Sequence, residues 1–178
     1  PLAVADLAEI ILQALDAVGE AHLAGVVHRD LKPGNLFLTA AADGSPFVKV
    51  LDFGISKAAS HDDGLTATGE LLGSPRFMAP EQMKRALEVD ARADIWALGV
   101  VMHELLTGAR AFEGESVAEL IVVILQDEPP PITRADVPPT FKGIVKRCLQ
   151  KNAADRYANV AELALALAPF APERARPY

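Results

Sequence analysis

Residues 28–35 read HRDLKPGN, and they directly follow Val26 and Val27, which we expect to form a short strand. Asp30 and Asn35 are five positions apart, with Lys32 between them. A carboxylate accepts a proton from a hydroxyl group, an amide oxygen can ligate Mg²⁺, and a lysine can neutralise a phosphate. This stretch therefore combines side chains suited to chemistry on a hydroxyl group and a phosphate.

Two further clusters follow along the chain. Residues 52–54 read DFG after another expected strand, and a carboxylate at a strand end beside a flexible glycine can hold a metal. Residues 79–81 read APE, beyond a long loop that we predict over residues 56–75. Taken separately, Asp30, Asn35 and Asp52 can also be ordinary turn residues, because Asp and Asn favour turns.

In this order, the three clusters resemble the catalytic loop, the D-F-G and the A-P-E of protein kinases. Lys32 and residues 73–78 (GSPRFM) resemble the serine/threonine class, whereas residues 89–99 (VDARADIWALG) and 105–108 (LLTG) resemble the eukaryotic-like kinases of bacteria. The resemblance covers nearly the whole chain. It implies a mainly α fold with a small β element (α+β), in which residues 1–178 form the C-terminal lobe of a protein kinase catalytic domain, a partial domain.

The resemblance implies ATP and Mg²⁺ as cofactors and assigns a role to each matching residue. Asp30 would orient the hydroxyl of a substrate Ser or Thr and accept its proton. Asn35 and Asp52 would hold the two Mg²⁺ ions that bridge the ATP phosphates. Lys32 would stabilise charge on the transferred phosphoryl group. Protein Ser or Thr side chains are therefore the implied substrates.

Regulatory positions are implied in the long loop. Ser74 lies where the family has a Thr or Ser that touches the catalytic Asp and positions the substrate. Thr66 and Thr68 lie where related bacterial kinases autophosphorylate, and a phosphate there would pair with Arg29. The alternative for these two threonines is a plain mobile loop.

Other matching residues have an implied structural role. Asp94 would bond the backbone of the catalytic loop, because a carboxylate on a buried helix needs partners. Glu81 and Arg156 would form an ion pair that ties the loop end to the late helices. The remaining members of this structural group are His28, Arg29, Phe53 and Gly54.

Outside these clusters, hydrophobic periodicity predicts the elements. Residues 2–23 read as an amphipathic helix that Gly25 ends, and strands are expected at 36–38 and 47–51 with a turn at Asp43-Gly44. Later helices are expected over 95–106, 116–125, 141–149 and 160–167. Residues 121–125 suit either core packing or a docking face.

Composition excludes several other classes. The chain has 17 Lys and Arg against 24 Asp and Glu, a net charge of −7, so no basic field exists for general nucleic-acid binding. Cys148 is the single cysteine, which excludes an internal disulfide and a Cys-based zinc site. The apolar run 95–102 is too short to span a bilayer. We expect the cytoplasm, either for the chain itself or for the cytoplasmic part of a longer membrane-anchored kinase.

The sequence contains neither a G-x-G-x-x-G-x-V loop nor a V-A-I-K lysine, which in kinases cover and hold the ATP phosphates. The resemblance therefore implies that an N-lobe, from the same longer chain or another chain, must complete the enzyme. A hydrophobic surface including Phe53 would face that lobe. Two functions follow: the catalytic lobe of a serine/threonine protein kinase, inactive without an N-lobe, or a free-standing non-catalytic docking or regulatory module.

Overall fold

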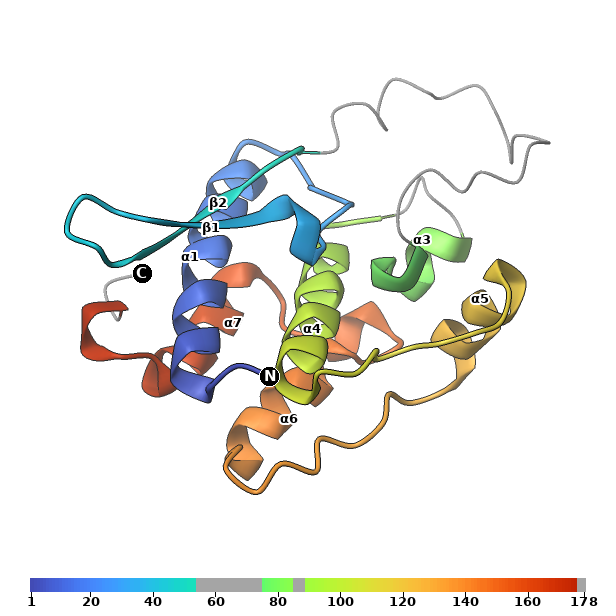
Figure 1. Ribbon diagram of the computed structural model, residues 1–178. Coiled ribbons are helices and arrows are strands. Elements are labelled where there is room, and N and C mark those ends of the chain that lie inside the picture. Colours follow the sequence, from blue (N-terminus) through green and yellow to red (C-terminus); the bar gives the residue numbers. More distant parts are fainter. Residues whose placement is uncertain (54–74, 85–88, 176–178) are drawn as a thin grey trace.

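The computed structural model describes residues 1–53, 75–84 and 89–175, and these form a mainly helical protein with one small sheet (Figure 1). The helices are α1 Val4–Leu23, α3 Pro80–Lys84, α4 Arg92–Thr107, α5 Val117–Gln126, α6 Pro139–Cys148 and α7 Val160–Leu167, and the strands are β1 Leu36–Ala40 and β2 Pro46–Val50. Short 3₁₀ turns lie at Pro33–Asn35, Pro75–Phe77, Ala153–Asp155, Ala168–Phe170 and Glu173–Ala175. The expected mainly α fold with a small β element is confirmed.

Helix α4 lies at the centre of the molecule, in contact with α1, α6 and α7 (Figure 1). A helix that is apolar on nearly every side must be covered on every side, and Ile95, Trp96 and Leu98 are fully buried. Gly108 ends the helix in the left-handed conformation at φ 72°, as its position predicts. This helix is the support on which the loops at its N-terminal end are built.

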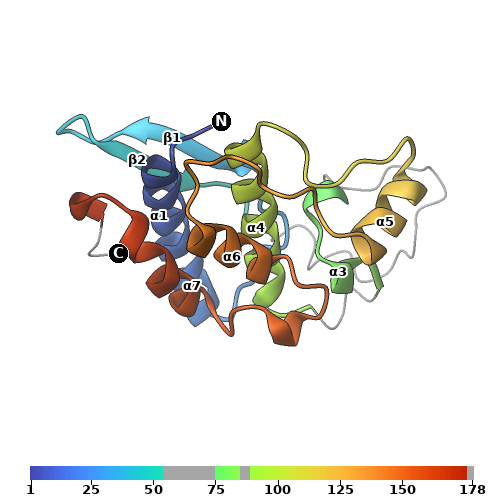
Figure 2. The same ribbon diagram turned by 90° about the horizontal axis from the view of Figure 1, so that it is seen from below.

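Helix α6 packs against α4 at Gly99, a residue that has no side chain. A Cβ atom on Gly99 would lie 2.7 Å from the Cβ of Cys148, so the glycine lets the two helices approach closely. Cys148 is buried in this contact, and burial raises the pKa of its thiol. Figure 2 shows α6 lying across α4, with α7 and α5 on opposite sides of α4.

The two strands form an antiparallel hairpin in which Leu36 pairs with Val50. Its turn has the expected Asp43-Gly44 pair, with Gly44 at φ 83°. Gln13 of α1 anchors β2, because its Nε2 donates to the Pro46 carbonyl at 3.0 Å and its Oε1 accepts from the Val48 backbone N–H at 2.9 Å. The hairpin is therefore held against α1, and its first strand directly follows residues 28–35.

The strand expected at Val26 and Val27 is not formed. The backbone N–H of Val26 bonds the carbonyl of Ala21 at 2.8 Å, so this segment is tied to the end of α1. A strand needs a neighbour to pair with, and in the described part of the chain the sheet consists of β1 and β2 alone. No helix among the described residues is long and apolar enough to cross a membrane.

Candidate active site

Asp30, Lys32 and Asn35 meet at the start of β1. The Lys32 ammonium lies 2.8 Å from Oδ2 of Asp30. The amide Nδ2 of Asn35 donates to the backbone carbonyl of Asp30 at 2.8 Å and approaches its Oδ2 at 3.5 Å. The 3₁₀ turn Pro33–Asn35 bends the chain so that these contacts form. The result is a carboxylate with a cation on one side and an amide on the other.

Asp52 lies two residues after the end of β2 and is exposed, and its neighbours tie it to the same place. The backbone N–H of Leu51 donates to the Asn35 carbonyl at 2.9 Å, and the Leu51 carbonyl accepts from Nε2 of His28 at 3.0 Å. The rings of His28 and Phe53 pack with centroids 4.8 Å apart. The structure therefore brings residues 28–35 and 52–53 together, and the buried His28 makes the side-chain contacts that join the two segments.

Backbone strain is found in both segments. Within the described ranges, the non-glycine residues with positive φ are Arg29 at 63° and Asp52 at 54°. This left-handed conformation is uncommon for side chains with a Cβ, and such strain is concentrated at functional sites. Both residues belong to the clusters that the sequence singles out for phosphate chemistry.

The carboxylate of Asp94 holds the strained segment at Arg29 in place through hydrogen bonds. It is fully buried at the start of α4, and its two oxygens accept the backbone N–H groups of His28 and Arg29, each at 2.9 Å. Nε2 of His22 lies 2.8 Å from its Oδ2. Buried carboxylates are stable only when their lone pairs are satisfied in this way. Asp94 therefore positions residues 28–29 without facing a substrate.

Glu81 and Arg156 form a two-point ion pair, with Nη1–Oε1 and Nη2–Oε2 distances of 2.7 and 2.8 Å. Arg156 is 2 % exposed, and its guanidinium also donates to the carbonyl of Gln150 at 2.8 Å and of Arg92 at 3.0 Å. Planar guanidinium and carboxylate groups match each other in this geometry. The pair fixes α3 relative to the chain before α7.

Four predicted positions, Gly54, Thr66, Thr68 and Ser74, lie outside the described residues, so their roles remain predictions.

Two residues of the site were missed by sequence reasoning. His22 stands outside the motifs that the sequence singles out, yet its Nε2 lies 2.8 Å from Oδ2 of Asp94. Gln82 bridges two segments, since its Nε2 donates to the Arg29 carbonyl at 3.0 Å and its Oε1 accepts from the Ala79 N–H at 2.9 Å. The local sequence does not indicate either role, because Asp94 lies far from His22 along the chain and Arg29 lies far from Gln82.

The oxygen atoms that the site offers as ligands suit a magnesium ion that also binds a phosphate group. Because Asn35 turns its amide nitrogen to Asp30, its Oδ1 is left out of that contact. Asp52 adds an exposed carboxylate. No cluster of three or more His, Cys, Asp or Glu side chains able to hold a metal occurs among the described residues. Mg²⁺ is usually held by one or two protein oxygens together with phosphates and water, so this sparse oxygen set fits it.

Comparison with known proteins agrees with this chemistry. A family model described as the protein kinase domain matches residues 2–166. The serine/threonine-protein kinase Pkn3 of Myxococcus xanthus is 41% identical over 183 residues, covering 99% of this chain and 33% of that protein. Pkn1 of the same organism is 42% identical (99% and 26%), and PknD of Mycobacterium tuberculosis is 41% identical (93% and 24%). The chain thus spans about a quarter to a third of the length of these relatives.

Proposed function

Because this chain belongs to the protein kinase domain family, we propose that it is the C-terminal, catalytic lobe of a bacterial eukaryotic-like serine/threonine kinase. In that role it transfers the γ-phosphate of ATP to a Ser or Thr hydroxyl of a protein substrate. The observation that carries the proposal is the contact of Asp30 with both Lys32 and Asn35, with Asp52 tied beside them through Leu51. ATP is made and used in the cytoplasm, which is therefore the proposed location.

Each side chain has a distinct task in this proposal. The Asp30 carboxylate orients the substrate hydroxyl and accepts its proton. Lys32, with its ammonium 2.8 Å from that carboxylate, neutralises charge on the phosphoryl group as it approaches the hydroxyl. Asn35 and Asp52 would hold Mg²⁺ through oxygen atoms, and the bound ion would neutralise the ATP phosphates. Asp94 keeps the backbone of residues 28–29 in the required conformation.

We further propose that an N-lobe completes the site. The hairpin and the residue that follows it carry a group of large exposed apolar side chains: Phe37 at 55%, Leu38 at 53%, Phe47 at 44% and Leu51 at 40%. Large apolar side chains that are exposed this close to Asp52 favour a partner that covers them. The covering lobe, from the same longer chain or another, would also supply the parts that hold the adenine and cover the phosphates.

The test compares this chain alone with the same chain joined to the N-lobe of a relative such as Pkn3. Transfer of labelled phosphate from Mg-ATP to a Ser/Thr-containing protein is measured. We expect activity from the completed protein and none from the chain alone. Asp30→Asn should lower kcat by about 10²–10⁴-fold, the usual contribution of a general base. Asp16→Asn, a substitution of an exposed carboxylate on α1, is the matched control and should leave kcat unchanged.

Equal kcat for Asp30→Asn and the unchanged protein would contradict the catalytic assignment. A completed protein that melts cooperatively but transfers no phosphate would favour the other candidate, a docking or regulatory module without catalysis.

A further inference from the structure

The side-chain amide of Gln82 connects helix α3 with the segment that carries Asp30. Its Oε1 accepts the backbone N–H of Ala79 at 2.9 Å, and its Nε2 donates to the backbone carbonyl of Arg29 at 3.0 Å. One partner can only donate and the other can only accept, so together they fix the orientation of the amide. Gln82 therefore forms two directed hydrogen bonds, one of which joins residues that are 53 positions apart.

The bond to Ala79 is local and belongs to the start of α3. Ala79 directly precedes the helix, and Gln82 is the third residue of it. A Gln or Glu at this position bonds the backbone N–H of the residue before the helix in the arrangement known as the capping box. A Glu side chain would make this bond equally well. The bond to Arg29 is different, because a carboxylate has no N–H group to donate to a carbonyl.

The carbonyl that Gln82 binds belongs to the peptide group between Arg29 and Asp30. At the other edge of the same peptide group, the Asp30 N–H donates to Nδ1 of His28 at 3.3 Å. Nδ1 can accept there because the other ring nitrogen, Nε2, donates to the Leu51 carbonyl at 3.0 Å. The peptide group that leads into Asp30 is thus held at both edges, by Gln82 on one and by His28 on the other.

This support acts on a strained part of the backbone. Arg29 has a φ of 63°, and its own N–H is bound by the buried carboxylate of Asp94 at 2.9 Å. Such a conformation persists only where its surroundings hold it. Asp94 holds the N–H of Arg29, and Gln82 holds its carbonyl. Without Gln82, the following peptide group can rotate and displace the Asp30 carboxylate.

Helix α3, which carries Gln82, is itself held in place. The neighbouring Glu81 forms the two-point ion pair with the buried Arg156, at 2.7 and 2.8 Å. A side chain on an element that is fixed in this way holds its own partner more precisely than one on a free loop. The position of α3 is therefore passed on to the carbonyl of Arg29.

We propose that Gln82 is a positioning residue for the catalytic base and acts through the peptide group between Arg29 and Asp30. This inference rests on the proposed function. The amide of Gln82 keeps the Asp30 carboxylate directed at the substrate hydroxyl. A small displacement of a general base slows the reaction strongly, because proton transfer requires hydrogen-bond geometry.

Two variants of similar length separate the two bonds. Gln82→Glu keeps an oxygen for the Ala79 N–H but loses the donor to Arg29, whereas Gln82→Met makes neither bond. In the completed protein, this chain joined to the N-lobe of a relative, we expect both variants to lower kcat by about 10- to 100-fold. The KM for Mg-ATP should stay within about twofold, since Gln82 does not hold the nucleotide.

Thermal melting distinguishes positioning from a merely structural role. The melting temperature should fall more in Gln82→Met than in Gln82→Glu, because the carboxylate still caps α3 and lies at the favourable end of the helix dipole. Equal losses of kcat with unequal losses of stability are therefore expected. If Gln82 served only to stabilise α3, Gln82→Glu would keep its kcat.

Hydrogen exchange provides a readout that needs no catalysis. In the 178-residue chain alone, the Asp30 amide should exchange about tenfold faster in both variants, because its peptide group loses one of two restraints. If the unchanged completed protein transfers no phosphate, the proposed function fails. The exchange rates then still decide whether Gln82 holds this peptide group.

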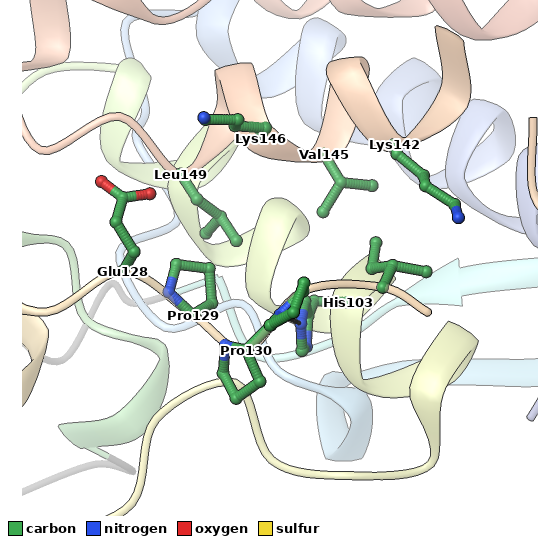
Figure 3. Close-up of a pocket in the computed structure, with 10 residues that line it drawn as sticks. His103, Glu128, Pro129, Pro130, Lys142, Val145, Lys146 and Leu149 are labelled. Atoms are coloured by element: carbon green, nitrogen blue, oxygen red, sulfur yellow. Dashed lines mark hydrogen bonds between the residues drawn. The ribbon is translucent and has the colours of Figure 1, made fainter. Parts of the chain in front are cut away.

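Two controls use exposed lysines. Lys84→Gln changes the last residue of α3, the helix that carries Gln82. Lys146→Gln changes α6, where Figure 3 shows Lys146 beside a pocket of about 330 Å³ that His103 and Glu128 also line. In Figure 1, α6 lies at the opposite end of the view from the hairpin. Neither control should alter kcat or the exchange rate at Asp30.

The inference is overturned if Gln82→Glu has the kcat of the unchanged completed protein. It is also overturned if the Asp30 amide exchanges at the same rate in the unchanged chain and in both Gln82 variants, since the peptide group would then be held without Gln82.

Discussion

The carboxylate of Asp94 accepts the backbone N–H of Arg29 at 2.9 Å, although the two residues are 65 positions apart. Arg29 has a φ of 63°, a conformation that costs free energy for a residue with a Cβ. A fully buried acceptor that meets the N–H in this conformation stabilises it. The buried helix α4 thereby determines the backbone geometry of the segment that carries Asp30.

Replacement of Asp94 by Asn should destabilise the protein by about 2–4 kcal/mol. An amide can offer one oxygen, so one of the two N–H groups of His28 and Arg29 would face an NH₂ group. We expect a lower free energy of unfolding in urea and faster hydrogen exchange at the Arg29 amide. The exposed Asp90→Asn is the control, with a loss of about 1 kcal/mol or less. Unchanged exchange at Arg29 would show that Asp94 does not hold this segment.

Removal of the guanidinium in Arg156→Ala should cost about 3–5 kcal/mol, because it leaves the Glu81 carboxylate and three backbone carbonyls without their partner. Arg92→Ala is the control, because its pair with Asp90 is partly exposed to solvent, with side chains 32% and 51% exposed, and such pairs contribute about 0–1 kcal/mol. Thermal and urea unfolding measure both. An unchanged melting temperature in Arg156→Ala would contradict the structural role of this pair.

Two helical glycines, one inside the contact between α4 and α6 and one outside it, give a paired prediction. Gly99→Ala places a Cβ 2.7 Å from the Cβ of Cys148, so α4 and α6 must separate, and we expect a loss of about 1–3 kcal/mol. Gly143→Ala, inside α6, meets nothing within 4 Å and should stabilise by about 0.5–1 kcal/mol, because alanine favours a helix. Urea unfolding distinguishes the two. The idea of close helix contact fails if both variants shift stability in the same direction.

Glu162 makes stability depend on pH at the start of α7. Its carboxylate accepts the Ala158 N–H at 2.7 Å, and this bond, followed by the hydrogen bond from Arg147, lowers its pKa in the folded protein. A carboxylate with a lowered folded pKa stabilises above its unfolded pKa of about 4.3, and the contribution is lost as pH falls through the folded value.

Melting temperatures of Glu162→Gln and the unchanged protein should therefore differ most near neutral pH and converge below about pH 4. Glu20→Gln, in an exposed position on α1, is the control and should follow the unchanged protein throughout. A difference that grows on acidification would have the wrong sign for this mechanism.

Much of the local structure was predictable from the sequence. The helices over 95–106 and 160–167 were placed by periodicity, and α4 and α7 occupy nearly those positions. Gly108 and the Asp43-Gly44 pair mark a helix end and a hairpin because φ and hydrogen bonding at these residues are decided within a few positions. The prediction of a strand at Val26 and Val27 was wrong, because strand formation is not decided within a few positions of the chain. An apolar, β-branched pair forms a strand only if the fold places a partner beside it.

The sequence by itself determined which chemical groups the protein contains and the short-range contacts among them. Asp30, Lys32 and Asn35 lie so close along the chain that one 3₁₀ turn brings them together. Only the tertiary structure decided what surrounds them, such as the bonds from His22 to Asp94 and from Gln82 to Arg29, and the pocket beside His103. These depend on how α4 is buried among its neighbours. Because the hydrophobic effect acts on every apolar residue in the same way, the local sequence does not indicate which residues will meet in the folded protein.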